Sequence, residues 1–230
     1  MGKDATFRFE SRDTLFPIYL WRFRIDDHVA LNRGLLKEIA KRRSSEPGLE
    51  NRQIRYGWQS ERDLFRRSEP AHQKLALAIN LIVGEAIEGL WQPGALAGYA
   101  IVANGWININ PPGGYNAPHI HPDALISGTY YVSLPTGANP FGGAIEFNLP
   151  HPTLNTSNLL VMPMLADRVR VVPEPGLVLL FPGTLPHWVH PNDSDQDRIS
   201  ISFNAVIRPK KRVAPKGPGP NLRGEARRRS

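Results

Sequence analysis

Four of the seven histidines lie in two short segments, and their spacing is suited to binding a metal ion. His119 and His121 are two residues apart, so on a β-strand their side chains would point to the same face. His187 follows a distant apolar run and could supply a third ligand. Such a facial set leaves the opposite coordination positions open. The chain has no Cys, so imidazole and carboxylate groups would hold the ion, which suits Fe(II).

Asp123 offers an alternative to a three-histidine site. If the strand continues past Pro122, His121 and Asp123 share a face and could bind the metal together with His187. In the other register, His119, His121 and His187 are the ligands. In both registers we expect Asp123 to lie close to the metal, where it could accept a hydrogen bond from a ligating imidazole.

A second pair of residues predicts what binds beside the metal. Arg198 and Ser200 are two residues apart in an alternating segment, so they share its polar face. A guanidinium beside a hydroxyl forms a cradle for a carboxylate. A metal centre next to such a cradle is what a chelating keto acid with a second carboxylate requires.

The elements that must position these residues change type along the chain. Helical periodicity predicts helices over 31–43 and 70–90. Runs rich in Val, Ile, Tyr and Phe, separated by Gly and Pro clusters, predict strands over 99–110, 124–134, 143–147, 167–172, 176–181 and 198–207. We therefore expect a mainly β sandwich or barrel over 97–207, supported by helices within 1–95, in one domain that spans 1–207.

The charge is concentrated at the end of the chain. The formal net charge is +7, but nine basic residues and one acid fall within 208–230, which leaves 1–207 with 19 basic and 20 acidic residues. We expect 208–230 to be a disordered basic tail, the only part suited to nucleic acid. There is no recognisable export signal and no apolar run of the roughly 18 residues that span a bilayer, so we expect a cytoplasmic protein without a membrane partner.

The order of motifs from Trp106 to Ile207 resembles that of the Fe(II)/2-oxoglutarate-dependent oxygenases, and of a bacterial subgroup with an HxHP motif in particular. The matching motifs are, in order, WININ, HIHP, SGTYYV, GGAIEF, GLVLLFPGTLPHWV and RISISFN. The general motif of the superfamily has Asp where this chain has His121. The subgroup pattern favours the three-histidine register, and Asp123 remains the alternative carboxylate ligand.

The resemblance implies a fold, a chemistry and further site residues. The implied fold is a double-stranded β-helix, the jelly roll that cupins also have. The implied enzyme is a dioxygenase that uses Fe(II), 2-oxoglutarate and O2, hydroxylates an unactivated C–H bond and releases succinate and CO2. His119, His121 and His187 would be its catalytic metal ligands. Asn108 and Tyr131 would line the keto-acid pocket with the Arg198 and Ser200 pair.

Two other functions fit parts of the sequence. One is a cupin-type metalloenzyme without a keto acid, because the chain matches several positions of the cupin motifs. However, the chain lacks the glutamate of these motifs, and this function leaves Arg198 and Ser200 unexplained. A non-catalytic jelly-roll binding protein would not need clustered histidines. The substrate, a small molecule or peptide of unknown identity, would contact loops such as 134–143 and 148–167. A homodimer is one oligomeric state that the sequence allows.

Overall fold

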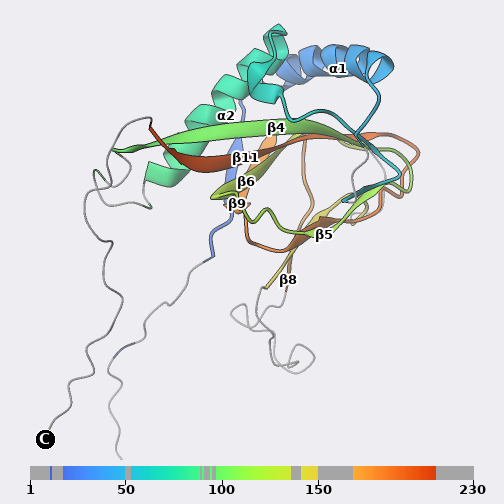
Figure 1. The fold of residues 1–230 in the computed structure, drawn as a ribbon. Helices are drawn as coiled ribbons and strands as arrows, with labels where there is room; N and C mark the ends of the chain where they lie inside the picture. The colour runs from blue at the N-terminus through green and yellow to red at the C-terminus, as the bar shows by residue number, and fades with distance from the viewer. Residues whose placement is uncertain are drawn as a thin grey trace, which may run out of the picture.

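The computed structural model describes residues 11, 18–49, 53–88, 90, 94, 97–135, 141–149 and 168–210 (Figure 1). These residues form two antiparallel sheets and two α-helices. Most of the expected basic tail and of the expected substrate loops lies outside the described residues. Among the described residues, no helix is sufficiently long and apolar to traverse a bilayer.

The larger sheet has six strands in the order β1-β9-β6-β11-β4-β3. Their bounds are β1 Trp21–Arg24, β9 Leu177–Pro182, β6 Ile126–Ser133, β11 Arg198–Pro209, β4 Tyr99–Asn110 and β3 Trp58–Gln59. The long strands β4 and β11 pair over their whole length, from Arg198 opposite Asn110 to Pro209 opposite Tyr99. Their register brings Ser200 opposite Asn108 and therefore places both on one face of the sheet.

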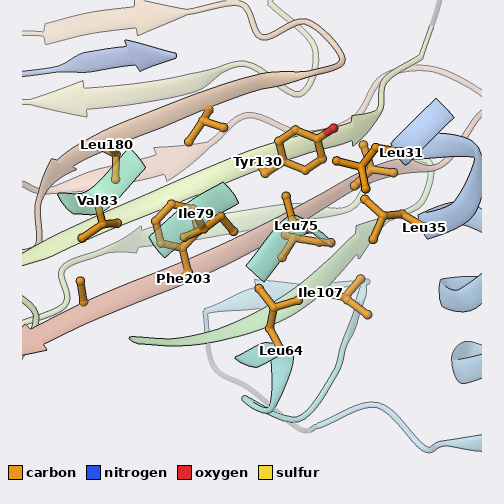
Figure 2. Close-up of a cluster of buried hydrophobic side chains, with 14 of the residues drawn as sticks. Leu31, Leu35, Leu64, Leu75, Ile79, Val83, Ile107, Tyr130, Leu180 and Phe203 are labelled. Carbon is orange, nitrogen blue, oxygen red and sulfur yellow. The ribbon is translucent and has the colours of Figure 1, made fainter. Parts of the chain in front are cut away.

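Both helices lie on one side of this sheet (Figure 1). The predicted helices are confirmed as α1, His28–Ser45, and α2, Pro70–Glu88. Apolar side chains four residues apart, such as Leu75 and Ile79, form one stripe on α2. This stripe packs against Ile107 and Phe203 of the sheet in the main hydrophobic core (Figure 2). The opposite face of the sheet is therefore free to line a cavity.

The smaller sheet has five strands in the order β2-β5-β10-β7-β8. Their bounds are β2 Ile54–Arg55, β5 Tyr115–His119, β10 His187–Val189, β7 Ile145–Asn148 and β8 Arg168–Val171. Side chains of both sheets, including Phe147 and Phe181, form a second core. The predicted mainly β jelly-roll fold is confirmed, with its strands divided between two sheets.

The N-terminal section also contributes strands, which the sequence analysis did not predict. β1 extends the larger sheet beside β9, and the short strands β2 and β3 add to one edge of each sheet. The 3-10 helix η1, Leu64–Arg66, follows β3 and buries Leu64 in the main core. The N-terminal segment that we expected to support the fold with helices therefore also supplies edge strands to both sheets.

Candidate metal centre

Three histidine side chains converge between the two sheets. One nitrogen from each of His119, His121 and His187 lies within 4.8 Å of the others. The ring centroids are 4.9 Å apart for His119 and His121, 4.3 Å for His119 and His187, and 5.2 Å for His121 and His187. This spacing allows all three to bind one metal ion.

Two strands and one loop position the cluster. His119 is the last residue of β5 and pairs directly with His187, the first residue of β10. His121 lies beyond the end of β5, so the expectation that both members of the motif share one strand is wrong. The His121 backbone N–H donates to the Gly183 carbonyl at 2.7 Å, which holds the loop against the end of β9. The loop therefore replaces the strand as the support of the second ligand.

Hydrogen bonds leave a metal-binding nitrogen available on two of the rings. Nδ1 of His119 lies 2.7 Å from the Ala117 carbonyl, and Nδ1 of His187 lies 2.9 Å from the Leu185 carbonyl. Because a carbonyl oxygen only accepts, each Nδ1 carries the proton and each Nε2 presents its lone pair. This donor set fits a metal ion that imidazole binds well.

The environment keeps the three rings neutral. Burial lowers the pKa of His187 to about 3 and that of His121 to about 4. Burial also lowers the pKa of His119, although its hydrogen bond to the Ala117 carbonyl opposes this shift. Neutral imidazole is the form that binds metals, so all three rings are ready to ligate near pH 7.

Asp123, the alternative ligand, lies apart from this cluster. It occupies the exposed turn after His121, and its carboxylate is not among the grouped ligand atoms. The candidate ligand set among the described residues is therefore three neutral imidazoles without a carboxylate, and a divalent ion there would keep its full charge.

Arg198 is 1% exposed and lies in the same cavity. Its Nε donates to the Gly143 carbonyl at 2.8 Å and its Nη1 donates to Ser200 Oγ at 3.1 Å. Among the described residues, no carboxylate forms an ion pair with it. A buried cation without a counter-charge is costly, so this guanidinium is placed to receive an anion.

Two buried polar atoms near Arg198 strengthen this interpretation. Neither Arg198 Nη2 nor the Tyr131 hydroxyl has a hydrogen-bond partner of regular geometry in the described structure, and the two side chains interact with each other. The Arg198 guanidinium carbon lies 5.3 Å from the centre of the Tyr131 ring. Burial raises the pKa of Tyr131 to about 12, although the nearby Arg198 charge opposes the shift, so the hydroxyl keeps its proton and can donate. The pair fits one carboxylate of a keto acid.

Apart from Asp123, the site residues expected from the sequence line one cavity. Asn108 is fixed there, since it accepts a hydrogen bond from Gln59 at 2.8 Å and donates to Ser202 Oγ at 3.0 Å. Tyr130, the neighbour of Tyr131, points away and donates to Asn32 of α1. Together the lining residues bring three convergent histidines and a buried guanidinium into one cavity.

The structure also places residues in and near the cavity that the sequence analysis missed. Gln53, Gln59, Thr129 and Ser202 contribute polar lining. Ser202 continues the alternation of Arg198 and Ser200 along β11, so this signal was present in the sequence. The two glutamines come from a segment without a strand-like pattern, and only the fold brings them to the cavity.

Comparisons with known proteins agree with this geometry. Residues 104–204 match a family model described as "Putative 2OG-Fe(II) oxygenase". No curated protein sequence matches the chain.

Solved structures of low sequence identity share the fold. A prolyl-4-hydroxylase from Pseudomonas putida superposes with a TM-score of 0.60 at 18% identity, over 81% of this chain and 91% of that one. HygX from Streptomyces hygroscopicus, solved with nickel, 2-oxoglutarate and hygromycin B, gives 0.56 at 14% identity, over 81% and 82%. A prolyl hydroxylase from Trichoplax adhaerens, in complex with a hypoxia inducible factor peptide fragment, gives 0.58 at 17% identity, over 81% and 83%.

The motif resemblance, the family match and a cavity that fits both a metal and a keto acid lead to one assignment. Over residues 104–204 the chain matches the Fe(II)/2-oxoglutarate-dependent oxygenases, which are non-haem iron dioxygenases that use 2-oxoglutarate and O2.

Proposed function

We propose that this protein hydroxylates an unactivated C–H bond of a small-molecule or peptide substrate and releases succinate and CO2. His119, His121 and His187 would hold Fe(II), and Arg198, Ser200 and Tyr131 would hold the far carboxylate of 2-oxoglutarate. One observation carries the proposal: a buried guanidinium without a carboxylate partner lies in the same cavity as three convergent histidines.

The protein's own residues would bind, orient and shield the reactants. Ferrous iron with 2-oxoglutarate and O2 supplies the oxidising power that breaks a C–H bond. The Arg198 fork suits bidentate binding of a carboxylate. Ser200 Oγ already accepts from Arg198, so its own proton can be donated to the same carboxylate. The Tyr131 hydroxyl would be a third donor to this carboxylate. Bonds to the carboxylate from Tyr131 and from Arg198 Nη2 would give both of these buried polar atoms a partner.

The neutral ligand set supports a dianionic cosubstrate. Three imidazoles add no negative charge at the metal, in contrast to a set that includes an aspartate. A dicarboxylate would bring one negative charge for the ion and one for Arg198. The two structural neighbours crystallised with hygromycin B and with a peptide fragment support small molecules and peptides as substrate classes.

Binding and turnover test the proposal separately. Titration calorimetry with Mn(II), which binds oxygen and nitrogen ligands without oxidising during the experiment, should show one metal site. The double variant His121→Gln/His187→Gln should lose it. 2-Oxoglutarate should then bind the Mn(II)-loaded wild type, and the Fe(II)-loaded protein should form succinate from it in air.

The outcomes separate the alternatives. Metal binding without 2-oxoglutarate binding would contradict the proposal and indicate a metalloenzyme without a keto acid. Absence of both Mn(II) and Fe(II) binding by the folded wild type would indicate a non-catalytic binding protein. Variants that unfold are recognised by circular dichroism, and they are replaced by the single substitutions.

A further inference from the structure

An exposed arginine lies beside the metal centre, and the reactions described above do not use it. The Arg62 guanidinium carbon lies 4.7 Å from the centre of the Trp106 ring. Trp106 is buried and lines the cavity, and its ring centroid lies 5.9 Å from that of His121. One indole therefore connects the exposed cation to a histidine of the candidate metal centre.

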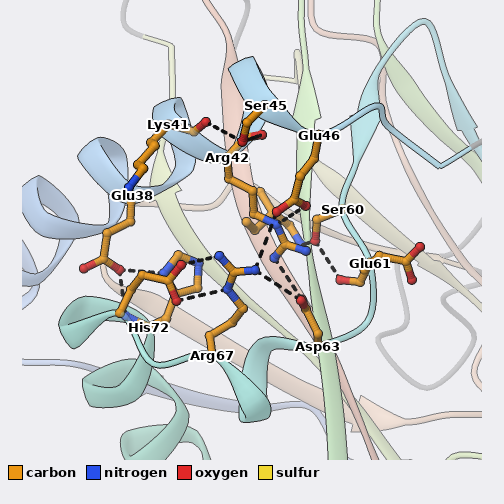
Figure 3. A network of polar contacts seen from close by, with 12 residues as sticks. Glu38, Lys41, Arg42, Ser45, Glu46, Ser60, Glu61, Asp63, Arg67 and His72 are labelled. Carbon is orange, nitrogen blue, oxygen red and sulfur yellow. Dashed lines mark hydrogen bonds and ion pairs between the residues drawn. The ribbon is translucent and has the colours of Figure 1, made fainter.

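The backbone around Arg62 is fixed from both sides. The Ser60 backbone N–H donates to the Ile107 carbonyl at 3.1 Å, and the Ile107 N–H donates to Ser60 Oγ at 2.9 Å. On the other side, Asp63 pairs with Arg42 at 2.9 Å (Figure 3). The next residue, Leu64, is buried in the main core. Arg62 is thus presented at a defined place on the margin of the site.

Arg62 differs from Arg42 and Arg67 in having no acidic partner among the described residues. It differs from Arg66, which also has none there, in lying over the Trp106 ring. Arg42 and Arg67, which flank the same segment, both form ion pairs with carboxylates (Figure 3). Among the described residues, no acidic group pairs with Arg62. Stacking on Trp106 occupies the face of the guanidinium and leaves its N–H edge free to donate. This arrangement is suited to a fixed, outward-facing anion contact.

We infer that Arg62 anchors an anionic group of the primary substrate, a carboxylate or a phosphate, at the solvent margin of the metal site. The inference deepens the proposed function and rests on it. Arg198 is buried and serves the cosubstrate, whereas Arg62 is exposed and stays accessible after the cosubstrate has bound. Residues 1–207 carry nearly equal numbers of basic and acidic residues, so selection for an anion would depend on this local contact.

The test uses simple anions and protein-bound Mn(II) as a paramagnetic reporter. The full-length protein is loaded with Mn(II) and saturated with 2-oxoglutarate, and calorimetry verifies both steps. Inorganic phosphate is then titrated and its ³¹P relaxation is measured, and acetate is titrated in a second arm with ¹H detection. The variant is Arg62→Gln. Its matched control is Arg66→Gln, which removes the same charge from an exposed position of the same segment.

We expect saturable relaxation enhancement of at least one anion in the wild type and in Arg66→Gln. In Arg62→Gln the apparent affinity should fall by about tenfold or more, because a charge-assisted hydrogen bond is lost. The anion with the stronger response identifies the preferred class. Equal enhancement in Arg62→Gln would place the anion on the metal and overturn the inference, as would the absence of enhancement in the wild type. Failure of Mn(II) or 2-oxoglutarate to bind would instead contradict the proposed function.

Discussion

Two arginines are almost equally buried in this protein, and their surroundings differ in charge. Arg42 of α1 is 3% exposed, and Arg198 of β11 is 1% exposed. Arg42 pairs with Glu46 at 2.6 Å and with Asp63 at 2.9 Å, in a network that continues to Arg67 (Figure 3). Arg198 has only neutral partners among the described residues. Each leaves its Nη2 without a hydrogen bond, so the difference lies in the carboxylates.

We interpret this difference as one between a charge that stabilises the fold, Arg42, and a charge that binds a ligand, Arg198. Carboxylates of the folded protein neutralise the charge of Arg42, and the resulting network joins α1 to the segment before α2. Under the proposed function, the charge of Arg198 would be paired only when an anion enters the cavity. A buried, unpaired charge costs stability in the free protein, and this cost is offset when a ligand binds.

Removing the structural charge should have the largest effect on folding. In Arg42→Met, Glu46 and Asp63 lose their nearest cationic partner and keep only the longer contacts to Arg67, so the free energy of unfolding should fall by about 3 kcal/mol. Urea denaturation measures this change. The control is Arg43→Met on the same helix, where an exposed pair with Asp197 is lost and the change should stay below about 1 kcal/mol. Equal effects in the two variants would show that the Arg42 network is not structural.

Removing the binding charge should instead act on the ligand. In Arg198→Met, the affinity of the Mn(II)-loaded protein for 2-oxoglutarate should fall about 100-fold, since the charged partner of a buried carboxylate is lost. The ligand-free variant should be as stable as the wild type or more stable. Calorimetry and urea denaturation give the two values. An unchanged affinity would remove Arg198 from the keto-acid site.

Ligand binding should stabilise the wild type through the same residue. At 100 times its dissociation constant, 2-oxoglutarate should raise the free energy of unfolding of the Mn(II)-loaded protein by about 2.7 kcal/mol. The same concentration should have little effect on Arg198→Met, because that variant binds weakly. Thermal unfolding with and without the ligand compares them. Stabilisation of both proteins to the same extent would mean that binding does not involve the guanidinium.

Burial in the cavity should also disfavour protonation of its histidines. His121 and His187 have pKa values of about 4 and 3 in the folded protein, below the 6.5 of the unfolded chain. The unfolded chain therefore takes up more protons as the pH falls below 6.5, and the metal-free protein loses stability. The expected loss is about 1 kcal/mol per pH unit for each of the two groups between pH 6 and pH 5.

Urea denaturation across this pH range measures the slope, and His121→Gln/His187→Gln is the comparison. The double variant should show a shallower dependence, because neither replacement titrates. An identical slope in the two proteins would show that these rings are not held neutral by the fold.

Sequence patterns predicted the long elements well, because such elements carry their own periodicity. β4 has the predicted bounds of 99–110, and α2 begins at the predicted Pro70. The short strands β1, β2 and β3 were missed, because strands of two to four residues form through pairing with a neighbour rather than through their own pattern.

The site shows the same division. The alternation of Arg198, Ser200 and Ser202 could be recognised in the sequence, and so could the paired histidines. Arg62 could not, because the role that we infer for it depends on its contact with Trp106, 44 positions away, and on the absence of an acidic partner among the described residues. The end of β5 at His119 was also not predictable from alternation alone.

The most direct test of the account is an anaerobic titration of the Fe(II)-loaded protein with 2-oxoglutarate, followed by the weak visible charge-transfer absorption of the bound keto acid. The account predicts a saturable band in the wild type and in Arg43→Met. At the same 2-oxoglutarate concentrations, the band should be much weaker in Arg198→Met and absent in His121→Gln/His187→Gln. If Fe(II) binds but the band never appears, or if Arg198→Met gives the wild-type curve, the account is contradicted.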